Sequence, residues 1–396
     1  MIASRTRTLG PEHRDTLDSR YALAVALRDA EKYAESEKEL RSVIPIQARV
    51  LGPEDPDTLC SRMNLATALE EQDEHAAAEA ELQALLPLLT RVKGAEHRET
   101  LRTRGHLATL LFHLGKYTDS ETEYRQVLAI QQRVLGAEDL GTLLTRRNRA
   151  APLIKLGKLA EAETVCRQVL AIHERVLGAE NRETLRSRDL LAAALYQGGK
   201  FTEAEAECRR VLAIRERLLG AEDKATLDTR FKLAKTLSAQ DRYADAAPLH
   251  RALLPLLTRI HGAEHEDTLE CQTYLADSLS HLDQSAEAVE ICRRVLPILT
   301  RLCGPGSEDT LRPHWTLAAA LSKMGKKEES EQEFRKILAI SASSQGTDTP
   351  YSIATLNTLV ETLSKQGKHA EAGQLAGKLI AIRTRVLGPT HAETLS

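Results

Sequence analysis

The chain has 396 residues, of which 42% are hydrophobic but only 3% aromatic, and its formal net charge is −3. This length allows two or three ordinary domains or one elongated array, and the core must be built from Leu, Ala, Val and Ile, which suits closely packed helices. A general nucleic-acid-binding protein would be basic overall, so the charge balance argues against that class.

The cysteines and the N-terminal residues indicate the cellular compartment. The six cysteines form no CxxC pair, so we expect small buried hydrophobic residues in a reducing compartment. The N-terminal stretch MIASRTRTLGPEH lacks an apolar signal-peptide core, and no apolar run approaches the roughly 18 residues of a membrane span. These features predict a soluble cytoplasmic protein with no membrane partner.

A glycine recurs every 42 residues from Gly10 to Gly388 without insertion or deletion. It lies in variants of one motif, as in LGPEDPDTL (51–59) and LGAENRETL (177–185). This period predicts a single continuous array over residues 1–396, with partial repeats at both ends. The nine full repeats are 10–51, 52–93, 94–135, 136–177, 178–219, 220–261, 262–303, 304–345 and 346–387.

Each repeat opens with the signals of a helix start. Three residues after the glycine stands a side chain that can cap a helix, and an acid often follows, where the helix dipole favours it. The caps are His13, Asp55, His97, Asp139, Asn181, Asp223, His265, Ser307 and Thr349. Because the histidines of this phase, including His391, recur at the repeat spacing, we interpret them as helix-boundary residues and expect no metal or cofactor.

A first helix, helix A, follows in each repeat. Leucines four residues apart, such as Leu65 and Leu69, form a buried stripe, and a small residue, such as Ala66, lies between them. The fourth repeat departs from this pattern within TRRNRAAPLIKLGK (145–158), where Arg149 replaces the first leucine and Pro152 stands inside the helix. We expect the proline to bend the helix and to let Arg149 reach solvent or the ligand-binding face, as a contact or a hinge.

A second helix, helix B, runs from a polar turn such as GKY (115–117) to the next glycine, which caps its C-terminus. Its small positions, such as Ser36 and Ala78, allow a close crossing with helix A. Four B helices carry a proline at one phase, for which we expect an effect on curvature: Pro45, Pro87, Pro255 and Pro297.

The motifs NLATAL (64–69), GKYTDSE (115–121) and YRQVLAI (124–130) resemble the tetratricopeptide repeat, and the 42-residue unit is similar to the kinesin-light-chain and nephrocystin type. The resemblance covers essentially the whole chain. It implies an all-α, right-handed superhelical solenoid of antiparallel helix pairs, with the A helices lining a concave groove. Independently, two-helix units can bury their stripes only against neighbours, which also predicts a solenoid.

The chain begins and ends inside a repeat, and neither end carries a polar capping repeat. We therefore expect a segment of a longer protein, or end-to-end self-association with another copy.

No catalytic or nucleotide-binding motif occurs, so we expect no enzyme activity. Two arginine series also follow the period, one from Arg20 to Arg230 and one from Arg7 to Arg385. Either they track phosphates or they pair with the glutamates that recur from Glu12 to Glu264; the shared period favours ion pairs.

Helix A positions that should face the groove vary between repeats. They are acidic in the first two repeats, basic with aromatics in the middle, and include Tyr274, Asp277, Arg312 and Trp315 later. Either these are solvated surface, or the middle repeats bind an acidic, partly apolar peptide. The resemblance implies that Asn64 and Asn148 hold peptide backbone. The candidate groove residues are Asn64, Arg102, His106, Phe112, Arg147, Asn148, Lys155, Arg186, Tyr196, Phe231, Lys232 and Lys235.

The sequence thus predicts a non-catalytic scaffold that binds an acidic and apolar peptide or protein segment. One alternative is the sensor arm of a larger bacterial signalling NTPase, by resemblance to arrays that follow such modules. A second alternative is groove binding of single-stranded nucleic acid, which would show a steep salt dependence.

Overall fold

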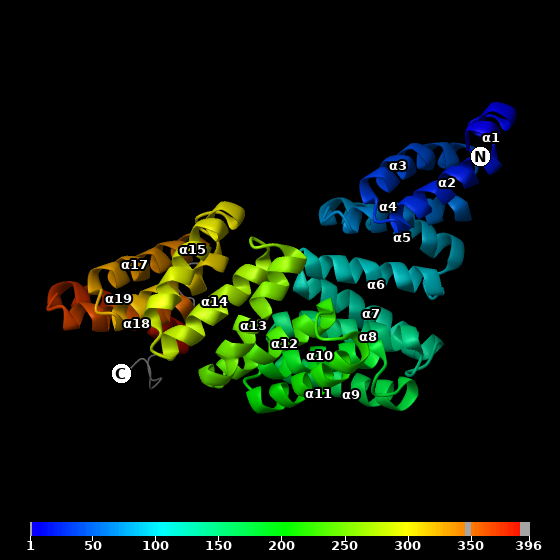
Figure 1. Ribbon diagram of the computed structural model, residues 1–396. Helices are drawn as coiled ribbons and strands as arrows, with labels where there is room; N and C mark the ends of the chain where they lie inside the picture. Colours follow the sequence, from blue (N-terminus) through cyan, green and yellow to red (C-terminus); the bar gives the residue numbers. More distant parts are fainter. Residues whose placement is uncertain (1, 345–349, 389–396) are drawn as a thin grey trace. The chain divides into compact units, whose positions relative to one another are not determined.

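Every regular element in the described residues, 2–344 and 350–388 of the computed structural model, is a helix (Figure 1). Two compact units, Met1–Lys200 and Phe201–Ser396, divide the chain at the turn between α10 and α11. The first unit contains α1 (Ile2–Leu9), α2 (Arg14–Asp29), α3 (Tyr33–Val50), α4 (Pro56–Glu70), α5 (His75–Lys93), α6 (Arg98–His113), α7 (Tyr117–Val134), α8 (Leu140–Lys155), α9 (Leu159–Leu177) and α10 (Arg182–Gln197). The second contains α11 (Phe201–Leu219), α12 (Lys224–Ser238), α13 (Tyr243–His261), α14 (Glu266–His281), α15 (Ser285–Cys303), η1 (Glu308–Thr310), α16 (Leu311–Lys323), α17 (Lys327–Ser344), α18 (Pro350–Lys365) and α19 (His369–Leu387).

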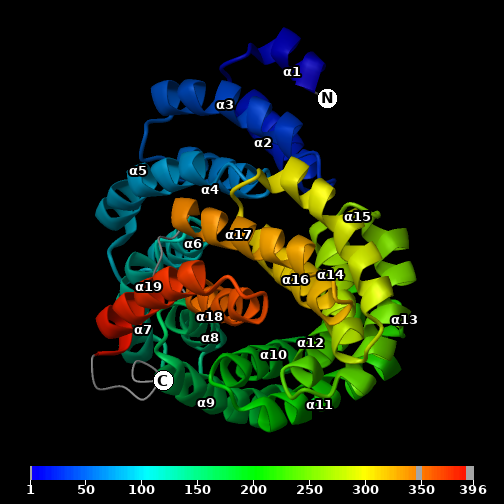
Figure 2. The same ribbon diagram turned by 90° about the vertical axis from the view of Figure 1, so that its left-hand side faces the viewer.

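Even-numbered helices from α2 onward are the predicted A helices, and the odd-numbered ones are the B helices. Within each unit, each helix packs against the next one along the chain, as Figure 2 shows for α2 with α3 and for α18 with α19. A helices also touch the next A helix, as α6 touches α8 in the first unit and α14 touches α16 in the second. This packing of consecutive helix pairs confirms the predicted all-α solenoid of tetratricopeptide type.

The repeated linker motif is explained by hydrogen bonds at the helix boundaries. All eight caps from His13 to Ser307 accept a hydrogen bond from the backbone N–H two residues on, as predicted; Thr349 and His391 lie outside the described residues. Gly94 has φ +95°, and its N–H donates to the Thr90 carbonyl at 3.0 Å. The motif threonine is buried, and the Thr100 hydroxyl donates to the Gly94 carbonyl at 2.9 Å.

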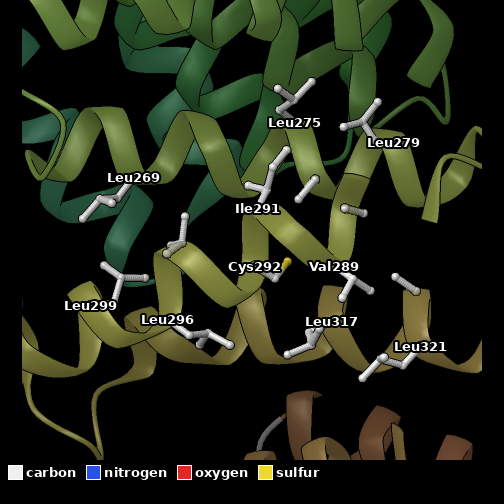
Figure 3. Packing of buried hydrophobic residues seen from close by; sticks show 14 of the residues in the cluster. Leu269, Leu275, Leu279, Val289, Ile291, Cys292, Leu296, Leu299, Leu317 and Leu321 are labelled. Carbon is white, nitrogen blue, oxygen red and sulfur yellow. The ribbon is translucent and has the colours of Figure 1, made fainter. Parts of the chain in front are cut away.

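The predicted leucine stripes form the core. In the second unit, Leu275 and Leu279 of α14 pack with Leu296 of α15 and Leu317 of α16, all at most 8% exposed (Figure 3). The first repeat is an exception, because Leu23 on α2 is 40% exposed. No other A helix precedes α2 in the described residues, so one side of this stripe lacks its usual neighbour.

Small residues bring paired helices close together, as predicted. The hydroxyl of Ser36 on α3 donates to the Ala24 carbonyl of α2 at 2.8 Å, and Ser120 donates in the same way to Ala108 at 2.6 Å. These bonds place a side chain of helix B directly on the backbone of helix A. A larger residue at either position would separate the pair.

The expectation that Arg149 reaches solvent or the groove is wrong. α8 runs as one helix through the buried Pro152, and the Arg149 side chain is only 13% exposed. Its guanidinium lies 2.7 Å from a carboxylate oxygen of Glu121 on α7 and also pairs with Glu161 on α9. The leucine position therefore holds an arginine that pairs with a buried glutamate on α7 and with an exposed glutamate on α9.

The cysteine prediction holds for four of the six residues. Cys166, Cys208, Cys271 and Cys292 are buried, whereas Cys60 and Cys303 are exposed, so for these two it is wrong. No helix in the described ranges combines the length and apolar character that crossing a bilayer requires.

Candidate functional site

A cavity of about 420 Å³ lies between α6, α7 and α8, wholly within the first unit. We call it the arginine pocket. It brings together three of the predicted groove residues, Arg102, His106 and Asn148. Arg98, Tyr124 and several leucines complete its wall.

Two glycines lie at unusual positions in the arginine pocket. Gly105 on α6 stands where other repeats carry large side chains such as Met63, Phe231 and Trp315. An added Cβ at Gly105 would meet no atom within 4 Å, so the missing side chain leaves space. Gly141 on α8 stands where most repeats carry the first-turn acid, so this pocket also lacks a carboxylate that its neighbours have.

The two arginines of the arginine pocket are not engaged in ion pairs. Arg98 and Arg102 are exposed and make no ion pair with any described residue. Asp139 is in the wall, but its carboxylate accepts hydrogen bonds from the backbone N–H of Gly141 and Thr142 as the cap of α8. Two guanidinium groups that make no ion pair within the fold can bind a carboxylate.

The pocket is otherwise apolar or neutral. Leu135, Leu140 and Leu144 are 38%, 57% and 44% exposed, an unusual grouping of large apolar side chains in contact with water. Burial lowers the pKa of His106, and the nearby Arg102 lowers it further, so its imidazole is neutral at pH 7. The pocket therefore combines a cationic rim with an apolar surface.

Asn64 and Asn148 differ in their surroundings. Asn148 lines the arginine pocket, and its amide oxygen accepts hydrogen bonds from the Arg147 guanidinium at 3.3 and 3.4 Å. Asn64 lies outside it, and its amide donates to the Tyr21 hydroxyl at 2.9 Å and accepts from Arg28. The role in holding peptide backbone stays a prediction for both; Asn64 already uses its amide within the fold.

Several predicted groove cations are paired within the fold. Arg147 and Arg186 both pair with Glu183, Lys232 pairs with Asp228 at 2.6 Å, and Lys235 pairs with Glu270 at 2.8 Å. The sequence pattern did not reveal these acids, because they lie three or four residues away on the same helix or about 36 residues away on the next A helix. Lys155 is exposed and makes no ion pair with a described residue.

The predicted aromatic residues lie apart from the arginine pocket. Phe112 packs against Tyr117 with ring centroids 5.5 Å apart, and Tyr196 is half-buried on α10. In the second unit, Phe231 packs edge-on against Tyr274, and the Lys235 ammonium lies 4.9 Å from the Tyr274 ring centre.

The ion-pair interpretation of the arginine series is confirmed for most members, with one correction. The series near the ends of the B helices pairs with the predicted glutamates, as Arg49 with Glu12 at 2.5 Å and Arg301 with Glu264 at 2.6 Å. The other series uses different acids: Arg20 pairs with Glu39, Arg62 with Glu81, Arg104 with Glu123, Arg188 with Glu174 and Arg230 with Glu216. In the series from Arg20 to Arg230, only Arg146 makes no ion pair within the described residues.

One group of possible metal ligands occurs in the described residues, formed by His261, His265 and Asp267, whose ligand atoms lie within 4.8 Å of one another. The His265 Nδ1 atom already accepts the Asp267 backbone N–H at 3.2 Å as the cap of α14. This is the boundary role predicted from its spacing, and binding a metal through that atom would remove the cap.

Comparison with family models gives matches to the tetratricopeptide repeat. One model matches residues 15–91, 57–133, 99–151, 142–207, 189–259 and 267–343, and a second model of the same description matches 352–393. No relative is found among curated proteins.

Three solved structures illustrate the likeness. The nearly identical repeats of a putative kinesin light chain from Podospora anserina are 26% identical, with 51% of this chain and 96% of that chain covered and a TM-score of 0.44. A Rap protein complexed with competence and sporulation factor is 10% identical, with 94% and 98% covered and a TM-score of 0.56. A signal-transduction ATPase with a tetratricopeptide repeat sensor from Pyrococcus horikoshii is 13% identical, with 88% and 53% covered and a TM-score of 0.56.

Proposed function

The chain belongs to the tetratricopeptide repeat family, and on that premise we propose that it is a non-catalytic scaffold that binds an acidic, partly apolar protein segment at the arginine pocket. Repeats of this family commonly serve protein–protein interaction, which supports the general class. The acidic and apolar character of the ligand is our own inference.

The observation that carries this proposal is the pair Arg98 and Arg102 beside exposed leucines. Most arginines of the two periodic series are ion-paired, whereas these two have no acid partner in the described residues. A ligand carboxylate would gain charge-assisted hydrogen bonds without breaking an existing pair, and an adjacent apolar side chain would cover Leu140 and Leu144.

The same ion pairs argue against the nucleic-acid alternative. A phosphate-tracking stripe needs arginines that are available along the array, but most arginines of both series pair with glutamates. Binding of labelled oligo(dT) should therefore be weak, whereas a nucleic-acid reader would bind it with a steep salt dependence. The sensor-arm alternative predicts the same pocket with a ligand segment supplied by a further domain.

The test uses the full chain and a fluorescein-labelled Gly-Leu-Glu-Leu-Glu-Gly peptide, with Gly-Leu-Lys-Leu-Lys-Gly as its charge-reversed partner. Fluorescence polarisation should show binding of the glutamate peptide alone. Replacing Arg98 and Arg102 together by glutamate should abolish it. The matched control is Arg182→Glu with Lys38→Glu, because Arg182 occupies the position of Arg98 two repeats later and both control residues are exposed. Equal loss in both double variants, or equal binding of both peptides, would refute the proposal.

A further inference from the structure

A second cavity, of about 410 Å³, lies wholly within the unit Phe201–Ser396. Side chains from α13, α14, α16 and α18 line it, and we call it the aromatic pocket. Its main lining residues are Tyr243, Asp277, His281, Arg312, Trp315 and Tyr351.

Aromatic residues are concentrated here in a chain that has few. The sequence contains one tryptophan, eight tyrosines and four phenylalanines, and the tryptophan and two tyrosines line this pocket. Tyr243 stacks on His281 with ring centroids 4.0 Å apart and planes 9° apart. Trp315 packs edge-on against Phe334, which is 1% exposed. The rings are thus held by packing and form fixed walls.

Asp277 brings a mostly buried carboxylate to these walls, with its side chain 17% exposed. The nearest atoms of Arg312 and His281 lie 4.0 and 3.9 Å from its oxygens, beyond hydrogen-bond reach. His281 instead donates to the Asp277 backbone carbonyl at 2.9 Å, and Thr316 reaches the carboxylate at 3.5 Å. Ion pairs elsewhere in this unit are closer, such as the 2.8 Å between Lys235 and Glu270.

The electrostatic balance at Asp277 agrees with this geometry. Burial raises the pKa of its carboxyl group, and the opposing effects of Arg312 and His281 are smaller. The Arg312 guanidinium lies 4.5 Å from the centre of the Tyr274 ring, so part of its attraction is directed to that ring. The carboxylate therefore retains capacity to accept strong hydrogen bonds from a cation that enters the pocket.

We propose that the aromatic pocket binds a cationic side chain, lysine or arginine, of a partner protein. Its ammonium or guanidinium donates to Asp277, while the aromatic side chains of Tyr243, Trp315 and Tyr351 surround it as the pocket lining. Arg312 is a competing cation near the same carboxylate and limits the affinity. The proposal shares no residue with the arginine pocket, so each can fail without the other.

The experiment follows tryptophan fluorescence, because Trp315 is the sole tryptophan and lines the pocket. The full chain is titrated with the capped peptides acetyl-Gly-Arg-Gly-amide, acetyl-Gly-Lys-Gly-amide and acetyl-Gly-Glu-Gly-amide. The arginine and lysine peptides should give a saturable change, and the glutamate peptide should give none. Absence of a saturable change with both cationic peptides would overturn the proposal.

Two variants should change the affinity for the arginine peptide in opposite directions. Asp277→Asn keeps the size of the side chain and should weaken binding of the arginine peptide about ten-fold or more, through loss of a charged hydrogen bond. Arg312→Ala should strengthen that binding, because it removes the competing cation. Glu290→Gln, an exposed carboxylate on α15, is the matched control and should change nothing. If Arg312→Ala weakens binding of the arginine peptide, Arg312 is not a competing cation and the proposal is wrong. If the acetyl-Gly-Glu-Gly-amide peptide binds best, the pocket takes an anion and the proposal is also wrong. The Arg312→Ala result decides even if Asp277→Asn fails to fold.

Discussion

Arg149 on α8 places its guanidinium 2.7 Å from a carboxylate oxygen of Glu121 on α7, in a slot that holds leucine in the other repeats. Glutamates at the position of Glu121 normally pair with a basic residue of the turn 37 positions later, as Glu79 with Lys116 and Glu163 with Lys200. For Glu121 that residue is Lys158, which makes no ion pair in the described residues. Arg149 has taken the place of the turn lysine.

This substitution of partners predicts a non-additive effect on stability. Arg149→Leu restores the leucine stripe and leaves Lys158 to pair with Glu121, so it should change the free energy of unfolding by no more than about 1 kcal/mol. Adding Lys158→Ala should lower the free energy of unfolding by about 3 kcal/mol more. Glu121 is 8% exposed, and its nearest remaining cation would then be Arg125, 4.0 Å away.

Urea denaturation of the two single variants and the double variant measures the coupling. Lys158→Ala alone should be neutral. If the two single effects simply add, Lys158 does not replace Arg149.

Arg146 predicts a stabilising substitution. Its equivalents Arg188 and Arg230 pair with glutamates 14 residues earlier, but Gln132 stands there instead, and burial lowers the pKa of the Arg146 guanidinium. Gln132→Glu should recreate the pair and raise the free energy of unfolding by about 0.3 to 1 kcal/mol. Gln83→Glu, one helix B earlier, is not opposite an unpaired arginine and should not reproduce the gain; thermal melts of both variants at low and high salt would show the difference.

The features of the fold that recur in every repeat could be predicted from the sequence, whereas a feature that occurs once could not. The caps, leucine stripes and small crossings recur in register, so nine aligned copies predicted them, and the structure confirms them with bonds such as Ser120 to the Ala108 carbonyl. Arg149 could not be placed in this way. Its partners Glu121 and Glu161 come from two other helices, and a single departure from the pattern does not indicate where the side chain goes.

The candidate site was only partly predictable for the same reason. Basic positions on helix A were visible, but the acids that neutralise Arg147, Lys232 and Lys235 lie at spacings that vary between repeats. Gly105 and Gly141 both interrupt the register, but a missing side chain carries no chemical group that would indicate a binding site. Gly105 contributes open space and Gly141 the absence of a first-turn acid.

His250 makes the stability sensitive to acid. Burial, with a smaller effect of Lys235, lowers the pKa of this histidine from 6.5 to about 4, so the folded chain keeps it neutral. The unfolded chain binds a proton below its ordinary value of 6.5, so stability is lost as the pH falls from that value towards 4. Between pH 7 and pH 4.5 this residue should account for about 2 to 3 kcal/mol of lost stability.

The matched variant is His250→Cys, because Cys166, Cys208 and Cys292 occupy the same position in other repeats. It should reduce the difference between the free energies of unfolding at pH 7 and pH 4.5 by that amount. An unchanged difference would show that His250 does not titrate in this range.

Gly105 connects the arginine pocket to a prediction in which stability and binding change in opposite directions. Gly105→Met introduces the residue that stands at this position in the second repeat. Glycine destabilises a helix interior, and a Cβ at Gly105 would meet no atom within 4 Å, so the substitution should raise the free energy of unfolding by about 0.5 to 1 kcal/mol. The same side chain would fill the pocket beside Arg102 and His106 and should lower affinity for the Gly-Leu-Glu-Leu-Glu-Gly peptide at least ten-fold, or by about 1.4 kcal/mol.

The control is Gly373→Met, at an exposed helical position of α19 where a Cβ would meet no atom within 4 Å. It should give the same gain in stability without the loss of binding. Polarisation and urea titrations on both variants separate the two effects: if Gly105→Met binds as well as the parent chain, the ligand does not enter this pocket.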